Sequence, residues 1–128
     1  MRADRQRRET GREGEDLACT HLASKGHVIL ERNWRAGHLE LDIITLHQDG
    51  IHFVEVKTRR APIQARPEEN VNWTKQKKIV AAAKRYLSSK NARHLGDLEI
   101  RFDVISIVLF ADKTEINHIT EAFIPLYI

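Results

Sequence analysis

The stretch that decides the fold lies between residues 40 and 58 and reads ELDIITLHQDGIHFVEVKT. Two runs in it are rich in Ile, Val, Leu, Phe and Thr, which are residue types that pleated strands prefer. Between the runs stands Asp49-Gly50. Asp-Gly is a strong signal for a two-residue hairpin turn, because a type I′ turn needs positive φ at both central positions. The sequence therefore predicts a β-hairpin that turns at Asp49-Gly50.

This turn predicts which side chains meet across the hairpin. Asp42 would face Lys57, and Glu55 would face Ile44. Side chains alternate along a strand with a period of two, so Asp42, Glu55 and Lys57 would point to one face of the sheet. A slip of one residue would send Asp42 to the opposite face. The sequence thus predicts two carboxylates and an ammonium group close together among apolar neighbours.

Charged groups in such surroundings need a partner, because burying an ion is costly unless it is paired or binds a metal. One interpretation is a structural ion pair between Asp42 and Lys57, with Glu55 solvated beside it. The other is a hard-cation site, because two carboxylates plus waters suit Mg²⁺ or Mn²⁺. Lys57 would then hold an attacking water or offset charge on a phosphate. The spacing by itself leaves both interpretations open.

The pattern Asp42…Glu55-x-Lys57 resembles the motif of the PD-(D/E)XK nuclease superfamily. A more specific resemblance rests on an ordered set of segments: GREGE at 11–15, RNWR at 32–35, ELD at 40–42, FVEVKTR at 53–59, the helix with Lys77, and RFDV at 101–104. In this order they resemble the YraN family, an uncharacterised bacterial family usually described as endonuclease-like and distantly similar to archaeal Holliday-junction resolvases. The resemblance spans nearly the whole chain.

The resemblance implies an α/β fold with a restriction-endonuclease-like core, in which a central mixed sheet is flanked by helices. It implies that Asp42 and Glu55 bind Mg²⁺ or Mn²⁺ and that Lys57 is catalytic. Glu15 lies where the superfamily often places a further acidic residue near the metal. The implied activity is metal-dependent hydrolysis of phosphodiester bonds in DNA or structured nucleic acid. One position departs from the family, which usually has Gly where this chain has Leu39.

Basic residues gather on both sides of this acidic centre, although the formal net charge is only +3. Residues 57–66 and 75–93 each contain Lys and Arg but no Asp or Glu. A single block of this kind is more often a solvated face, but two blocks beside one acidic centre favour a phosphate-backbone binder. We therefore expect nucleic-acid contacts from Arg59, Arg60, Lys75 and Lys77.

Two other classes of function stay open at this point. A nucleic-acid-binding module would have the nuclease fold and the basic blocks but no turnover. A structural or protein-interaction domain would use the acidic group only as an ion-pair network. Salt-dependent DNA affinity would separate the first two classes from the third, and metal-dependent cleavage would separate the nuclease from the binding module.

The composition narrows the class of protein. A chain of 128 residues predicts one domain that can bury a core without disulfides. A hydrophobic content of 41% and a charged content of 30% are typical of soluble globular proteins. The chain has neither an apolar run long enough to span a membrane nor the apolar region of a secretory signal. With Cys19 as its single cysteine, we expect a cytoplasmic protein without a membrane partner.

The remaining segments supply the order of the elements. Residues 1–9 resemble a flexible basic arm that precedes a single domain at 10–128. Thr10 and Glu13 have the spacing of a capping box, and Gly26 predicts the end of that helix. Further strands are expected at 27–32, 99–110 and 115–119, and a second helix at 72–89. The order α-β-β-β-α-β-β predicts a mixed sheet flanked by helices.

Three further features carry expectations. His47 and His52 would lie almost opposite each other near the turn, but a transition-metal site there would lack further ligands. Asp103 shares a face with Arg101, which predicts a surface pair, while a structural role behind the acidic site is equally compatible. The apolar tail 120–128 would pack on the core or on a partner subunit, and a homodimer would suit a branched substrate.

Overall fold

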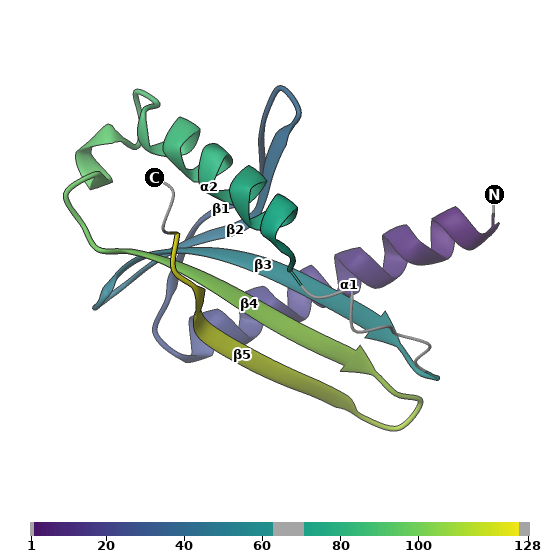
Figure 1. The fold of residues 1–128 in the computed structure, drawn as a ribbon. Coiled ribbons are helices and arrows are strands. Elements are labelled where there is room, and N and C mark those ends of the chain that lie inside the picture. The colour runs from purple at the N-terminus through teal and green to yellow at the C-terminus, as the bar shows by residue number, and fades with distance from the viewer. Residues whose placement is uncertain (1, 63–70, 126–128) are drawn as a thin grey trace.

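The computed structural model of the chain describes residues 2–62 and 71–125. Within them the chain forms a five-stranded sheet with the strand order β1-β2-β3-β4-β5, drawn in Figure 1. The elements are α1 (Arg2–Ser24), β1 (Val28–Ala36), β2 (Leu39–His47), β3 (Gly50–Arg60), α2 (Trp73–Leu87), the short 3-10 helix η2 (Arg93–Leu95), β4 (Ile100–Leu109) and β5 (Thr114–Phe123). Residues 63–66 of the first basic block and 126–128 of the apolar tail lie outside the described part.

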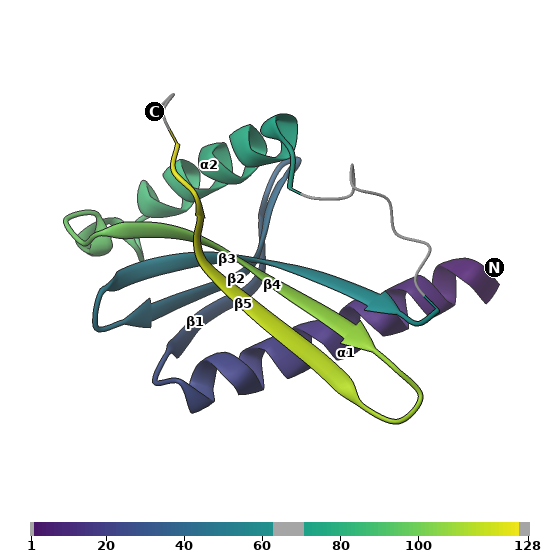
Figure 2. The ribbon, with the colours of Figure 1, turned by 60° about the horizontal axis from the view of Figure 1, so that its bottom comes forward.

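The sheet is mixed because its central connection differs from the others. Strands β1, β2 and β3 pair antiparallel, β3 and β4 pair parallel, and β4 pairs antiparallel with β5. Two parallel strands need a crossover, which α2 provides. Figure 2 shows α2 above the sheet and α1 beneath it. The prediction of one α/β domain with a mixed, helix-flanked sheet is confirmed, and the architecture is consistent with a nuclease-like core.

The strands carry apolar side chains on both faces, so each face needs a cover. On one face Phe53 and Phe102 pack with Tyr86 of α2. On the other face Ile43 and Ile105 pack with Leu22 of α1, which is fully buried. The two helices therefore hold the central strands β2, β3 and β4 from opposite sides.

The first helix begins earlier than its sequence pattern predicts. Helix α1 starts at Arg2, so Thr10 lies within the helix and the capping-box prediction is wrong. Residues 2–13 are mostly good helix formers, and they extend the helix through the expected cap. The Oγ1 of Thr10 instead accepts a hydrogen bond from the Nε of Arg60 at 3.3 Å. The end is as expected, because Gly26 follows the helix with a φ of +92°. The flexibility of residues 1–9 stays a prediction.

The register of the β2–β3 hairpin differs from the prediction by two residues. His47 pairs with Gly50, and Ile44 pairs with Phe53, so the turn consists of Gln48 and Asp49. Glycine is needed at position 50 for two reasons. Its φ is +131°, which other residues rarely adopt, and a Cβ there would lie 2.3 Å from the carbonyl oxygen of Glu99, ahead of β4. A shift of two preserves the alternation of faces. The side chains keep their predicted faces, but the predicted pairing of Asp42 with Lys57 is wrong.

In the described part of the chain, neither long helix has the length and apolar character needed to cross a membrane.

Candidate active site at the fork of the hairpin

The centre of the site is a fork between β2 and β3. The two strands pair from the turn as far as Ile43 and Val54. Beyond that point β2 rises with β1 beside α2, as Figures 1 and 2 show, and Leu41 joins the core under α2. Asp42 stands at the branch, where its Oδ2 accepts a hydrogen bond from the backbone N–H of Val56 at 2.8 Å. The packing of Leu41 under α2 thus separates β2 from β3 beyond Ile43. The Asp42 carboxylate then accepts the hydrogen bond of the Val56 amide.

The fork brings Asp42 into hydrogen-bonding contact with the carboxylate of Glu55. Burial and the negative charge of Glu55 raise the pKa of Asp42 to about 8, although the Val56 amide opposes this shift. Glu55 is itself only 9% exposed. Asp42 is half-buried. Two carboxylates in contact in such surroundings do not both ionise readily without a compensating positive charge. Their oxygen donors are those that Mg²⁺ and Mn²⁺ prefer, so the pair fits the expected metal.

Lys75 contacts this pair directly, whereas its position in the basic block 75–93 predicted only a contact with nucleic acid. Its Nζ lies 2.5 Å from the Oε1 of Glu55. The position of the helix start explains the contact: Asn72 caps α2 by accepting a hydrogen bond from the backbone N–H of Lys75 at 2.9 Å. The first turn of α2 therefore supplies positive charge to Glu55.

Glu15 reaches the site from α1. Its charge contributes to the raised pKa of Asp42, although less than Glu55 does. The Oε2 of Glu15 accepts a hydrogen bond from the Nδ2 of Asn33 at 2.9 Å. Asn33 has a positive φ of 51° within β1, a conformation that Asn tolerates better than most residues. Sequence reasoning missed Asn33 as a partner of Glu15. The tolerance of Asn for positive φ is the local signal that could have drawn attention to it.

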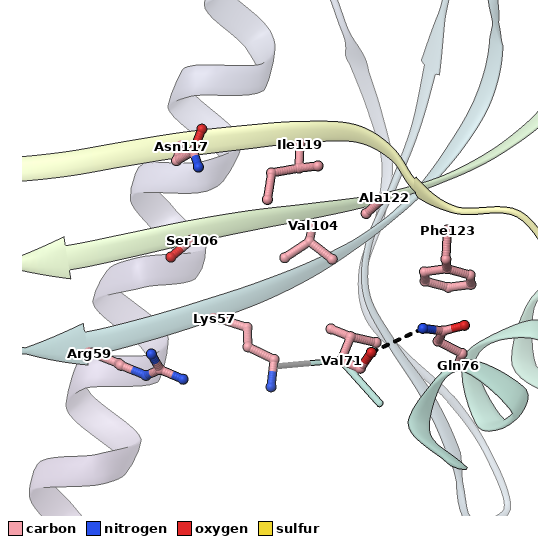
Figure 3. A pocket seen from close by; sticks show the side chains of 10 residues that line it. All are labelled: Lys57, Arg59, Val71, Gln76, Val104, Ser106, Asn117, Ile119, Ala122 and Phe123. Carbon is pink, nitrogen blue, oxygen red and sulfur yellow. Dashed lines mark hydrogen bonds between the residues drawn. The ribbon is translucent and has the colours of Figure 1, made fainter. Parts of the chain in front are cut away.

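The face of β3 that carries Glu55 continues into an open cleft of about 440 Å³. Figure 3 shows Lys57 and Arg59 on this face of β3, with residues of β4 and β5 beside them. Ser106 pairs with both Lys57 and Asn117, and so extends the polar wall across three strands. The cleft is lined by Lys57, Arg59, Val71, Gln76, Val104, Ser106, Asn117, Ile119, Ala122 and Phe123.

A second cleft, of about 410 Å³, lies between the β1–β2 hairpin and the start of α2. Glu55 and Lys75 both line it, together with Lys78. Glu55 of the acidic pair therefore opens into the second cleft, while the first cleft begins at Lys57, two residues further along β3. Both clefts contain basic side chains.

The other two predicted phosphate contacts lie away from the acidic pair. The Nη2 of Arg60 pairs with the Oε2 of Glu13 at 3.0 Å and ties the end of β3 to α1. The Nζ of Lys77 lies 5.8 Å from the ring centroid of Trp73 on the exposed side of α2. Their roles in binding nucleic acid stay predictions.

Asp103 is one of the most buried polar residues in the described structure, and the predicted surface pair with Arg101 is wrong. Its Oδ2 contacts ring nitrogens of His52 at 2.6 Å and His118 at 2.9 Å. The pairing of β4 with β5 is irregular between Phe102 and Val104. Arg101 pairs instead with Asp49 and Glu121. Asp103 therefore has a structural role among histidines.

Comparison with known proteins places these features in a family. The model of Uncharacterised protein family UPF0102 matches residues 14–107. The chain belongs to this family. The resemblance to the YraN family, which is UPF0102, is thus confirmed.

Three curated UPF0102 proteins are similar to this chain over most of their length. The UPF0102 protein of Syntrophomonas wolfei is 46% identical over 116 residues, which are 91% of this chain and 98% of the relative. That of Syntrophotalea carbinolica is 43% identical and covers 92% and 94% of the two chains. That of Bacteroides thetaiotaomicron is 40% identical and covers 91% and 93%. The UPF0102 match includes Glu15, Asp42, Glu55 and Lys57.

Proposed function

We propose that this UPF0102 protein is a metal-dependent endonuclease that hydrolyses phosphodiester bonds in DNA or structured nucleic acid. The observation that carries the proposal is the contact between the Asp42 and Glu55 carboxylates at the fork. Lys57 lies two residues beyond Glu55 on the same face of β3 and borders a cleft with Arg59. Acidic oxygen donors beside basic side chains are the combination that phosphodiester hydrolysis needs.

Each side chain has a defined role in this proposal. Asp42 and Glu55 would hold Mg²⁺ or Mn²⁺, which supplies positive charge for the phosphate and the attacking water when bound. The Lys57 ammonium would orient the water or stabilise charge on the phosphate oxygens. Glu15 would hold a water near Asp42. Arg59 would bind a phosphate in the cleft, as would Arg60, Lys75 and Lys77 along the path of the nucleic acid.

A nucleic-acid-binding module without turnover is the second candidate, and one observation favours it. The Lys75 ammonium on Glu55 supplies positive charge that a metal would otherwise supply. Replacing Lys75 by Met separates the candidates, because it removes this charge. If the protein is a nuclease, Lys75→Met is expected to keep or tighten Mg²⁺ binding in a calorimetric titration. In a pure binding module, the variant would bind no Mg²⁺ and would bind DNA more weakly.

The test of the nuclease is cleavage of labelled branched, single-stranded and linear DNA, and of RNA, with Mg²⁺ or Mn²⁺. Lys57→Met is expected to lower the rate at least about 100-fold, since removing one group that stabilises transition-state charge commonly costs this much. Lys113→Met is the matched control, because Lys113 is exposed in the β4–β5 turn, and its rate should equal that of the native protein.

Cuts that survive in Lys57→Met at the native rate would contradict the role given to Lys57. Cuts that also survive in Asp42→Asn would come from a contaminant. No cuts on any substrate, together with undetectable Mg²⁺ binding, would contradict the nuclease proposal. DNA affinity that persists and falls with salt would then support the binding module. The same substrates, followed by sedimentation, would show whether the protein acts as the homodimer expected for a branched junction.

A further inference from the structure

The turn end of the hairpin holds a cluster of histidines that the proposed nuclease does not use. One ring nitrogen from each of His27, His47 and His52 lies within 4.8 Å of the others. His27 and His52 are 8% and 1% exposed. The three rings come from separate elements: the residue before β1, the end of β2 and the start of β3.

Two of the rings are oriented by acceptors behind them. The Nδ1 of His52 donates to the Oδ2 of Asp103 at 2.6 Å. The Nε2 of His47 donates to the backbone carbonyl of Lys25 at 3.1 Å. These contacts direct the Nε2 of His52 and the Nδ1 of His47 toward the cluster. A carboxylate or carbonyl behind the ring is what metal-binding histidines almost always have.

The third ring has the same arrangement. The Nδ1 of His27 lies 2.7 Å from the hydroxyl oxygen of Thr45, which can accept its proton. The His27 ring stacks on His47 with centroids 4.2 Å apart and meets His52 edge-on at 4.8 Å. Its Nε2 is then the nitrogen available to a ligand that the three rings share.

A carboxylate completes the group from the turn. The Oδ1 of Asp49 lies 2.7 Å from the Nε2 of His52 and 3.2 Å from the Nδ1 of His47. Its other oxygen, Oδ2, lies 3.2 Å from the Nε of Arg101. Arg101 thus orients the side chain so that Oδ1 points at the two nitrogens.

We propose that His27, His47, His52 and Asp49 bind one Zn²⁺ ion at a structural site separate from the Asp42–Glu55 pair. Three imidazoles and a carboxylate are ligands that zinc accepts, and four protein ligands fill its tetrahedral shell. Tetrahedral zinc holds its ligand atoms roughly 3.4 Å apart. Binding would therefore turn the His27 and His47 rings out of their stack and move the Asp49 carboxylate back from the Nε2 of His52. Imidazole does not suit Mg²⁺, so the two sites would take different metals.

The bound ion would clamp three segments that are distant in sequence. It would join the α1–β1 junction to both ends of the β2–β3 turn. Asp49 and His47, at 47% and 27% side-chain exposure, would form the solvent side through which the ion enters.

The test is calorimetric titration of the full chain with ZnCl₂ after treatment with EDTA. We expect one Zn²⁺ per chain, and an at least tenfold loss of affinity in both His47→Gln and Asp49→Asn. Two controls are expected to keep the native zinc affinity: His94→Gln, because His94 is exposed in η2, and Asp42→Asn. Failure to bind Zn²⁺, or native affinity in both cluster variants, would overturn the proposal.

Co²⁺ gives a second measurement on the native protein, which does not depend on whether the variants fold. We expect the visible absorption of tetrahedral Co²⁺ without a thiolate charge-transfer band, because Cys19 is not among the ligands. An octahedral spectrum, or a thiolate band, would overturn the assignment of these four ligands. Cleavage of DNA plays no part in either measurement, so the zinc site and the nuclease can fail separately.

Discussion

Replacing Asp42 by Asn is expected to abolish metal-dependent cleavage and, in the absence of metal, to increase the free energy of unfolding at pH 8. The first effect follows because an amide binds Mg²⁺ far more weakly than a carboxylate does. The second follows because the half-buried carboxylate lies against Glu55, which disfavours its ionised form. The Asn side chain can keep the hydrogen bond from Val56 and donate one to Glu55 in place of the protonated carboxyl.

The sign of the pH dependence follows from the raised pKa of Asp42. In the unfolded chain this carboxyl titrates at about 4, whereas in the folded protein its pKa is about 8. Between these values the folded state retains a proton that the unfolded state releases. Stability therefore falls as pH rises through this window, by up to about 1.4 kcal/mol per pH unit. Asp42→Asn has no such proton, so this part of the slope should vanish.

Urea unfolding in EDTA at pH 5, 6.5 and 8 measures the effect. The variant should exceed the native protein slightly at pH 5 and increasingly toward pH 8. Mg²⁺ should then stabilise the native protein at pH 8 and leave the variant unchanged. Asp112→Asn is the control, because Asp112 is exposed in the β4–β5 turn. Parallel pH profiles of Asp42→Asn and the native protein would contradict the buried carboxylate pair.

Two glycines in α1, three positions apart, are expected to respond to the same substitution with opposite signs. A Cβ on Gly14 would lie 1.8 Å from the Oγ1 of Thr58 and 2.7 Å from its Cβ. Rotation of Thr58 cannot relieve the second contact, so α1 would have to lift from β3. We expect Gly14→Ala to lower the free energy of unfolding by roughly 3 kcal/mol, as severe overpacking does.

Gly11→Ala is the matched control, since nothing lies within 4 Å of a Cβ at that position. In a helix interior this change stabilises by about 0.5–1 kcal/mol. Urea midpoints of the two variants measure the contrast. Equal midpoints would show that α1 does not pack on β3 at Gly14. A destabilised Gly11→Ala would show that position 11 is not an open site within the helix. Because Glu15 follows Gly14, cleavage should fall in Gly14→Ala and stay unchanged in Gly11→Ala.

The hairpin shows how far a local pattern can predict a site. The alternation of apolar and charged residues placed Asp42, Glu55 and Lys57 on one face, and that assignment withstood an error of two residues in the register. The predicted position of the turn was wrong because the position depends on contacts beyond the hairpin. Asp49 pairs with Arg101 of β4, and Gly50 lies close to the backbone carbonyl of Glu99.

The sequence by itself determined the family, the α/β class, the order of the elements and the faces of the strands. Those properties follow from short-range periodicity and from motif order, which neighbouring residues encode. Only the tertiary structure decided that Asp42 meets Glu55 rather than Lys57, that Lys75 lies on Glu55, and that His27 joins the histidines of the turn. The physical reason is that the first two contacts depend on how packing under α2 separates β2 from β3. The third depends on where the end of α1 places the start of β1. Neither depends on residues that are close together in the sequence.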